Sequence, residues 1–164
     1  LFKLLDAFIN IDGAVLFMIG DGKERQNLIS YHKELALQNK VIFIERVPYQ
    51  DLRSYTKAAD VGIQFLENTN FNHYSASSNK LFEYIMAHVP VIGSKLPEIE
   101  KVIENEEIGL TVEAGNAEEL TEGLKKLIED DELRLKFKKN TEAAKYKYNW
   151  ENEKDVLKAL YTKL

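Results

Sequence analysis

Residues 80–94 read Lys80-Leu81-Phe82-Glu83-Tyr84-Ile85-Met86-Ala87-His88-Val89-Pro90-Val91-Ile92-Gly93-Ser94. The apolar positions up to Ala87 are spaced as in a helix, and the residues from Val89 to Ile92 are apolar without interruption. His88 lies at the expected helix end, where a left-handed conformation is common. Because the strand is apolar at every position, we expect helices to cover it on both faces, as in a parallel sheet.

The same alternation of strands and helices extends in both directions from this segment. Apolar runs predict strands near 14–19, 41–44, 61–66, 89–93 and 108–112, with helices between them and two more over about 131–147 and 150–162. We therefore expect an α/β fold in one domain over residues 1–164, a Rossmann-like three-layer αβα sandwich with a parallel sheet of about five strands. Asn116 and Glu119 are spaced as a helix-capping pair. Trp150 is expected to bury its ring against the domain and so to anchor the last helix.

Composition excludes several classes of protein. The 164 residues carry a formal net charge of −5, which disfavours binding to nucleic acid or to an anionic membrane surface. The absence of cysteine rules out disulfides, a thiol nucleophile and thiolate metal sites, and no histidines are spaced as metal ligands. No apolar run approaches the roughly 18 residues of a transmembrane segment, so we expect a cytoplasmic protein.

Charge is unevenly distributed along the chain. Residues 133–164 carry nine basic and four acidic side chains. Charges interleaved with leucines are typical of surface helices that expose a charged face to solvent. The alternative interpretation of this segment is a basic surface that docks a partner.

Ligands of parallel α/β folds bind beyond the carboxyl ends of the strands, so the loops after these strands are the places to look for a site. Gly20-Asp21-Gly22 follows the first strand, but Arg25 stands where a dinucleotide-binding fingerprint needs its third glycine. The two glycines are therefore interpreted as a structural turn.

The long polar loop over residues 67–78 is the second candidate, because long loops in compact domains often bind ligands. Ser77 or Ser78 can cap the helix that follows. The first backbone N–H groups of this helix can donate hydrogen bonds to a phosphate, and Lys80 adds a positive charge there. Glu83 lies one turn further on the same face, and an ion pair with Lys80 is its structural alternative. His73 is the histidine with a possible function, whereas His32 is expected in the core.

Residues 80–94 resemble the K-x-x-E-Y-M-A-x-x-x-P-V-I-x-S segment of GT-B glycosyltransferases of the glycosyltransferase 4 (group 1) family. Other family signals follow in the right order over essentially the whole chain. They are Gly20-x-Gly22, the strand from Val41 to Val47, Asp51-Leu52 with Tyr55 and Ala58 to Val61, Gly109-Leu110 with the Gly115-Asn116 turn, and Trp150.

The resemblance implies a binding site for the nucleotide-sugar donor of a retaining glycosyltransferase of hexosyltransferase type, with no cofactor and no metal site in this chain. By this resemblance Glu83 binds the ribose hydroxyls, and backbone amides at Ser78, Asn79 and Lys80 hold the diphosphate. The nucleotide base lies against Arg46 and Val47. Ser75 stands where the family's E-x7-E pattern has its first glutamate, and no catalytic residue is assigned.

The resemblance also implies that parts of the enzyme lie outside this sequence. The family's first strand of this domain, its glycine-rich loop and its phosphate-binding cations precede the first helix, and so does the N-terminal acceptor domain. We therefore expect an inactive fragment whose strands beside the missing one have exposed edges, with self-association as a consequence. The full-length enzyme could also sit peripherally at the inner membrane. A non-catalytic nucleotide-binding or regulatory module and a nucleotide-sugar 2-epimerase-like fragment are the alternatives.

Overall fold

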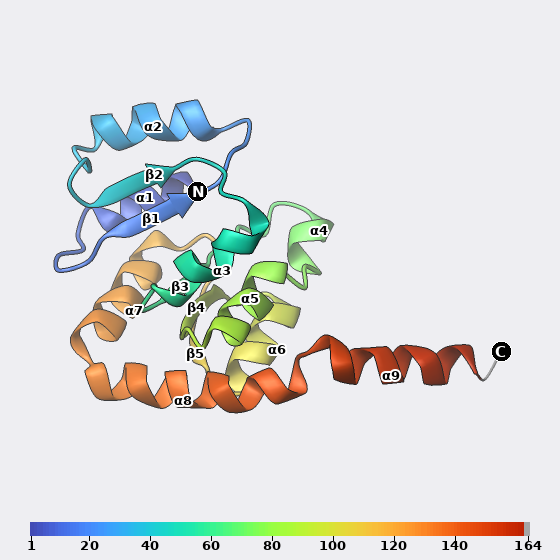
Figure 1. Ribbon diagram of the computed structural model, residues 1–164. Coiled ribbons are helices and arrows are strands. Elements are labelled where there is room, and N and C mark those ends of the chain that lie inside the picture. The colour runs from blue at the N-terminus through green and yellow to red at the C-terminus, as the bar shows by residue number, and fades with distance from the viewer. Residues whose placement is uncertain (163–164) are drawn as a thin grey trace.

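Five short parallel strands form the central layer of residues 1–162, the part of the chain that the computed structural model describes (Figure 1). They lie close to the positions that the apolar runs predict. The strands are β1 (Leu16–Ile19), β2 (Val41–Ile44), β3 (Gly62–Gln64), β4 (Val91–Ser94) and β5 (Gly109–Val112).

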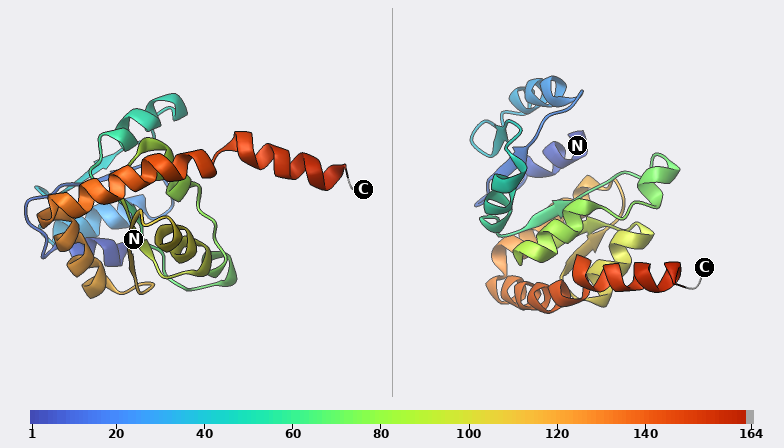
Figure 2. Two further views of the ribbon diagram at one scale, coloured as in Figure 1. Left: turned by 90° about the horizontal axis from the view of Figure 1, so that it is seen from below. Right: turned by 45° about the vertical axis from the view of Figure 1, so that its right-hand side comes forward.

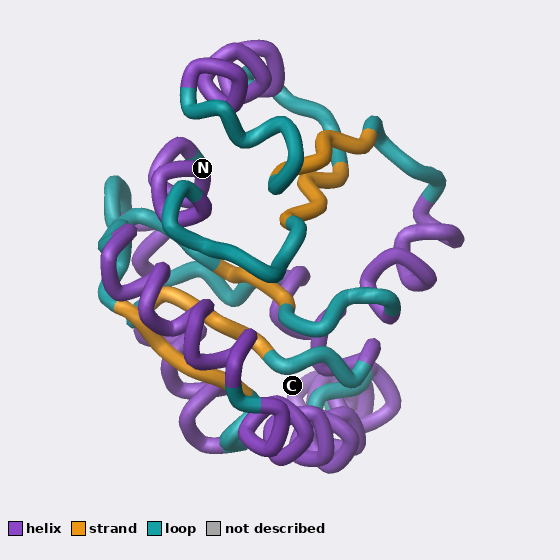
Figure 3. The backbone as a smooth tube through the Cα atoms, turned by 90° about the vertical axis from the view of Figure 1, so that its left-hand side faces the viewer, coloured by secondary structure: helices purple, strands orange, loops and turns teal. Residues whose placement is uncertain are grey.

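The expectation of a single sheet is wrong, because the strands form two sheets. One sheet pairs β1 with β2, and the other has the order β3-β4-β5. Figure 3 shows the two groups of strands apart from each other. A single hydrophobic cluster nevertheless contains Leu16 and Val41 of the first sheet with Ile92 and Val112 of the second. Both sheets therefore share one hydrophobic core.

Helices cover both faces of this layer, as the uninterrupted apolar strands predict. Ile92 packs into a cluster with residues of α1, α2 and α7, whereas its neighbour Val91 packs on the other face with residues of α5, α6 and α8. The bounds of the helices are α1 (Phe2–Phe8), α2 (Arg25–Glu34), α3 (Tyr49–Lys57), α4 (Phe71–Tyr74), α5 (Asn79–Ala87), α6 (Pro97–Asn105), α7 (Ala117–Glu129), α8 (Asp131–Lys147) and α9 (Trp150–Tyr161). None of these helices, within the described residues, is long and apolar enough to cross a membrane.

Three local predictions are confirmed. His88 ends α5 in the left-handed region, with φ 62° and ψ 41°. The side chain of Asn116 accepts hydrogen bonds from the backbone N–H groups of Glu118 and Glu119 and so caps α7. His32 is buried, with its ring edge-to-face against Phe43.

The prediction for Trp150 is wrong. Its side chain is 66% exposed, and no described residue of α9 is buried. Figures 1 and 2 show α9 continuing past the end of α8, away from the body of the molecule. Asn149 caps this helix with a hydrogen bond from the N–H of Asn152, so α9 begins without help from the indole. The ring is exposed because this helix does not lie against the domain.

Two basic side chains of α8 pair with carboxylates on the body of the molecule. Lys136 lies 2.7 Å from Glu107, and Lys147 pairs with Glu106. The neighbouring carboxylate raises the pKa of Lys147, as a salt bridge does. These contacts favour the interpretation of the basic segment as a structural, solvated helix face.

Candidate functional site

A cavity of about 890 Å³ lies between β1 and β3 and reaches the loop after β1 and the helix α5. Gly20, Asp21 and Gly22 of the loop after β1 line it, and so do Lys80 and Glu83 of α5. Because parallel strands place their carboxyl ends at one edge, the loop after β1 and the start of α5 meet there. The structure therefore brings two of the predicted site residues to the expected edge of the fold.

Glu83 keeps its carboxylate available. The side chain is half-buried, and within residues 1–162 it forms no ion pair. The structural alternative, an ion pair with Lys80 on the preceding turn, is therefore not formed. A carboxylate without a partner at a cavity wall can accept hydrogen bonds from ligand hydroxyl groups.

The N-terminus of α5 has no side-chain cap. Ser78 is the N-cap residue in an extended conformation, but its hydroxyl makes no capping hydrogen bond, and the N–H of Leu81 bonds to the Ser78 carbonyl. The backbone N–H groups of Asn79 and Lys80 have no acceptor among the described residues. The expected capping by Ser77 or Ser78 is thus absent, and the positive end of the helix dipole is open to an anion.

Tyr84 holds α5 against β3. Its ring fills the space above Gly62, where an added Cβ would lie 2.5 Å from the ring, and its hydroxyl donates to the carbonyl oxygen of Ile63 at 3.4 Å. Burial raises the pKa of the Tyr84 phenol above its usual value. The glycine in β3 is therefore explained by close approach of the helix that carries Lys80 and Glu83.

The long loop after β3 contains the short helix α4, which the sequence analysis did not predict. Asn70 caps it by accepting from the N–H of His73 at 2.9 Å, and this asparagine was the signal that could have indicated the helix. The ring nitrogen Nδ1 of His73 lies 2.9 Å from the carbonyl oxygen of Glu67 and 3.1 Å from Oγ1 of Thr69. His73 of α4 thus connects this short helix to Glu67 and Thr69 at the beginning of the same loop.

Ser94 fixes the beginning of this loop from the neighbouring strand. It is fully buried at the end of β4, where its hydroxyl donates to the carbonyl oxygen of Leu66 at 2.7 Å and accepts from the N–H of Leu66 at 2.8 Å. The local sequence pattern around Ser94 did not predict this role. The available signal was a hydroxyl residue at the end of an otherwise apolar, buried strand.

Replacing Ser94 with alanine is expected to lower the free energy of unfolding by about 1–3 kcal/mol, because the backbone groups of Leu66 lose their partner. Urea unfolding followed by circular dichroism measures the change. Ser30→Ala, at an exposed position of α2, is the matched control and should shift stability by less than about 0.5 kcal/mol. Equal stability of the two variants would show that water replaces the hydroxyl.

Three predicted site residues lie elsewhere. Arg46 is exposed and Val47 half-buried in the loop after β2, and neither lines the cavity. Ser75 ends α4, where its hydroxyl donates to the carbonyl oxygen of Phe71 at 2.9 Å. The assignment of these residues to the nucleotide base and the sugar stays a prediction.

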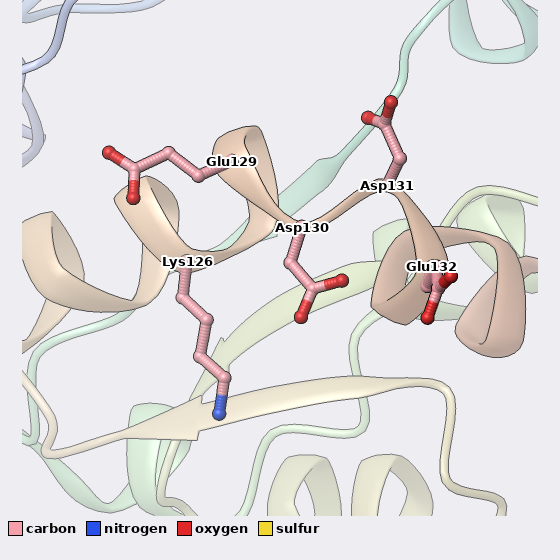
Figure 4. A pocket seen from close by; sticks show the side chains of 5 residues that line it. All are labelled: Lys126, Glu129, Asp130, Asp131 and Glu132. Carbon is pink, nitrogen blue, oxygen red and sulfur yellow. The ribbon is translucent and has the colours of Figure 1, made fainter.

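A second hollow lies at the junction of α7 and α8 and is lined by acidic side chains. Figure 4 shows that Glu129 and Asp131 point away from Asp130. Asp130 caps α8 through the N–H of Leu133, and Asp131 pairs with Arg134. No group of three potential ligands for a metal ion occurs in the described part of the chain. Asp130 and Asp131 are therefore accounted for by the first turn of α8, which they stabilise.

The fold and the site define a Rossmann-like α/β domain with its candidate site at the carboxyl edge of parallel strands. Residues 1–144 match the family model described as glycosyl transferases group 1, so the chain belongs to that family. It is similar to the lipopolysaccharide core biosynthesis glycosyltransferase LpsE of Rhizobium meliloti (strain 1021), with 25% identity over 134 residues. That match covers 82% of this chain and 37% of LpsE, so this chain spans well under half of the relative.

Solved structures show the same fold. HepE of Anabaena, in complex with UDP and glucose, superposes with a TM-score of 0.85 at 18% identity, over 99% of this chain and 44% of that chain. The C-terminal domain of the group 1 glycosyl transferase LpcC of Francisella tularensis superposes with a TM-score of 0.72 at 20% identity, over 90% of this chain and 80% of that one. The resemblance found in residues 80–94 is thereby confirmed at the level of family and fold.

Proposed function

We propose that this chain is the donor-binding part of a glycosyltransferase and binds a nucleoside-diphosphate sugar at the edge where α5 begins. The observation that carries the proposal is the unpaired carboxylate of Glu83 on the helix whose N-terminus is uncapped. A carboxylate can accept from two ribose hydroxyls at once. The free N–H groups of Asn79 and Lys80, with the Lys80 ammonium, suit the diphosphate one turn away.

The comparisons support this proposal without identifying the ligand. The family and LpsE are glycosyltransferases by name, and HepE was solved with UDP and glucose. We further propose that the whole enzyme transfers a hexosyl group with retention of configuration. In this proposal the sugar acceptor is held by an N-terminal domain, and no cofactor other than the donor is needed. A cytoplasmic position, or a peripheral one at the inner membrane, stays a prediction.

The isolated chain is expected to bind nucleotides weakly and to transfer no sugar. Among residues 1–162 we assign Lys80 as the cation that binds the diphosphate. The domain that would hold the sugar acceptor is not part of the fold described above. A transferase stabilises the departing nucleoside diphosphate with several preorganised donors and charges, so one lysine and two amides supply only part of that stabilisation.

Replacing Glu83 with glutamine is expected to weaken binding of the preferred nucleoside diphosphate by about 1.5–3 kcal/mol, since a neutral amide accepts ribose hydroxyl protons less strongly than a carboxylate. Isothermal titration calorimetry with UDP, GDP and ADP, and with their sugar conjugates, measures the loss and identifies the base.

Glu98→Gln is the matched control, because Glu98 is exposed in the first turn of α6, away from the cavity. Its affinity should equal that of the unaltered chain. Equal affinity of the Glu83→Gln variant would remove Glu83 from the site. Binding of nucleotides with no preference for sugar conjugates would favour a non-catalytic nucleotide-binding module.

A further inference from the structure

Gln64 is a buried polar residue whose side-chain oxygen has no hydrogen-bond partner. The residue lies in β3 and is 3% exposed, and no group among the described residues donates to its Oε1 atom. Buried side-chain oxygens are nearly always paired, because burial without a partner costs free energy. Departures from this rule are expected mainly at functional sites, where a group waits for its partner.

The side chain of Gln64 lies on the α5 face of the sheet. Ile63 and Phe65, on either side of it in the chain, pack into the cluster that contains residues of α1 and α7. Because successive side chains of a strand point to opposite faces, Gln64 points the other way. Gly62, two positions earlier on the same face, is covered by the Tyr84 ring of α5.

The position of Gln64 along α5 follows from the direction of this helix. α5 leads from the carboxyl end of β3 back to the start of the parallel strand β4, so it runs antiparallel to both strands (Figure 1). Two residues of a strand rise about 6.6 Å, and four residues of a helix rise about 6 Å. Because Tyr84 lies over Gly62, Gln64 lies beneath Lys80 and Leu81 in the first turn of α5.

The segment that leads into this turn has backbone donors without acceptors. The N–H of Leu81 bonds to the Ser78 carbonyl oxygen, whereas the N–H groups of Ser77 and Ser78 have no acceptor within residues 1–162. A side-chain carbonyl oxygen is an acceptor with two lone pairs. The unpaired oxygen of Gln64 and the unpaired N–H groups beside the first turn of α5 are therefore chemically complementary.

We propose that Gln64 is a positioning residue for the donor site, and the inference rests on the proposed function. When a nucleoside diphosphate binds at the N-terminus of α5, Oε1 of Gln64 accepts a hydrogen bond from the N–H of Ser77 or Ser78 and holds this segment against the sheet. The nucleotide-free chain carries the cost of an unpaired buried amide, and the bound chain does not. Gln64 thus adds to the affinity by favouring the bound arrangement of the segment.

Replacing Gln64 with methionine, which has a similar size and no amide, tests the nucleotide-free state. The melting temperature of the free chain is expected to rise by about 2–8 °C, because an unpaired polar group leaves the interior. Gln26→Met is the matched control, at an exposed position of α2, and should leave the melting temperature unchanged. A lower melting temperature of the Gln64→Met variant would show that the amide is already paired in the free chain, and would overturn the inference alone.

Isothermal titration calorimetry with UDP, GDP and ADP tests the bound state. The dissociation constant of the tightest-binding nucleotide is expected to rise at least about fivefold in the Gln64→Met variant and to stay unchanged in Gln26→Met. A purely structural role of Gln64 would move stability and affinity in the same direction, whereas a positioning role moves them in opposite directions.

Amide hydrogen exchange locates the new hydrogen bond. A saturating amount of the same nucleotide is expected to slow exchange at Ser77 or Ser78 by at least about tenfold in the unaltered chain, but not in the Gln64→Met variant. Equal affinity of the two proteins, or equal protection of these amides in both, would overturn the role of Gln64 and leave the proposed function standing. An unaltered chain that binds none of the three nucleotides would contradict the proposed function, and this inference with it.

Discussion

Replacing Gly109 with alanine is expected to unfold most of the protein. Gly109 stands opposite Val91 in the pairing of β5 with β4, and an added Cβ would lie 1.7 Å from the Val91 carbonyl oxygen. Since the obstacle is backbone, the two strands must separate to admit the methyl group. We expect a loss of more than about 4 kcal/mol, most of the stability of a typical domain. Circular dichroism and urea unfolding measure the loss.

Gly22→Ala is the matched control for this substitution. Gly22 lies in the loop after β1, where an added Cβ would meet no atom within 4 Å. Its stability should stay within about 0.5 kcal/mol of the unaltered chain. Native stability of the Gly109→Ala variant would mean that β4 and β5 are not paired in this register.

Replacing Ile85 with alanine is expected to cost about 2–5 kcal/mol, because it opens a cavity beneath α5. Ile85 is fully buried on this helix, in the cluster formed with β4, α6 and α8. The same helix carries Lys80 and Glu83, so looser packing should also weaken nucleotide binding at temperatures where the variant is still folded. Thermal unfolding and calorimetry measure the two effects separately.

Leu135→Ala provides the comparison, since the side chain of Leu135 is 64% exposed on α8. It should change neither stability nor binding by more than about 0.5 kcal/mol. A small loss for Ile85→Ala, similar to that of this control, would contradict the packing of α5 against β4 and α6.

Local patterns predicted the elements of the fold well. Val91 and Ile92 are neighbours that pack on opposite faces of the sheet, as an uninterrupted apolar run indicates. Asn116 and His88 mark the helix ends that their side chains and backbone preferences favour. These predictions succeed because a cap or a hydrophobic period depends on residues within a few positions of each other.

The candidate site was predicted only in part. Residues 80–94 indicated the helix that carries Lys80 and Glu83, and the structure places both side chains at the cavity. It does not place Arg46, Val47, Ser75, Ser78 or Asn79 among the residues that line the cavity. The missed contact of Ser94 with Leu66 joins β4 to the loop after β3, across 28 positions of the chain. No local pattern reports such a pair, since it depends on the order and register of the strands.

From its sequence alone, this protein could be assigned its strands, its helices, its family resemblance and the helix that bears the candidate site. Tertiary structure alone decided which of the predicted site residues line the cavity between β1 and β3, and that Trp150 is exposed. The physical reason is the range of the interactions. Hydrophobic periodicity shows which side of an element prefers burial, whereas burial itself depends on whether a distant segment of chain lies there to cover it.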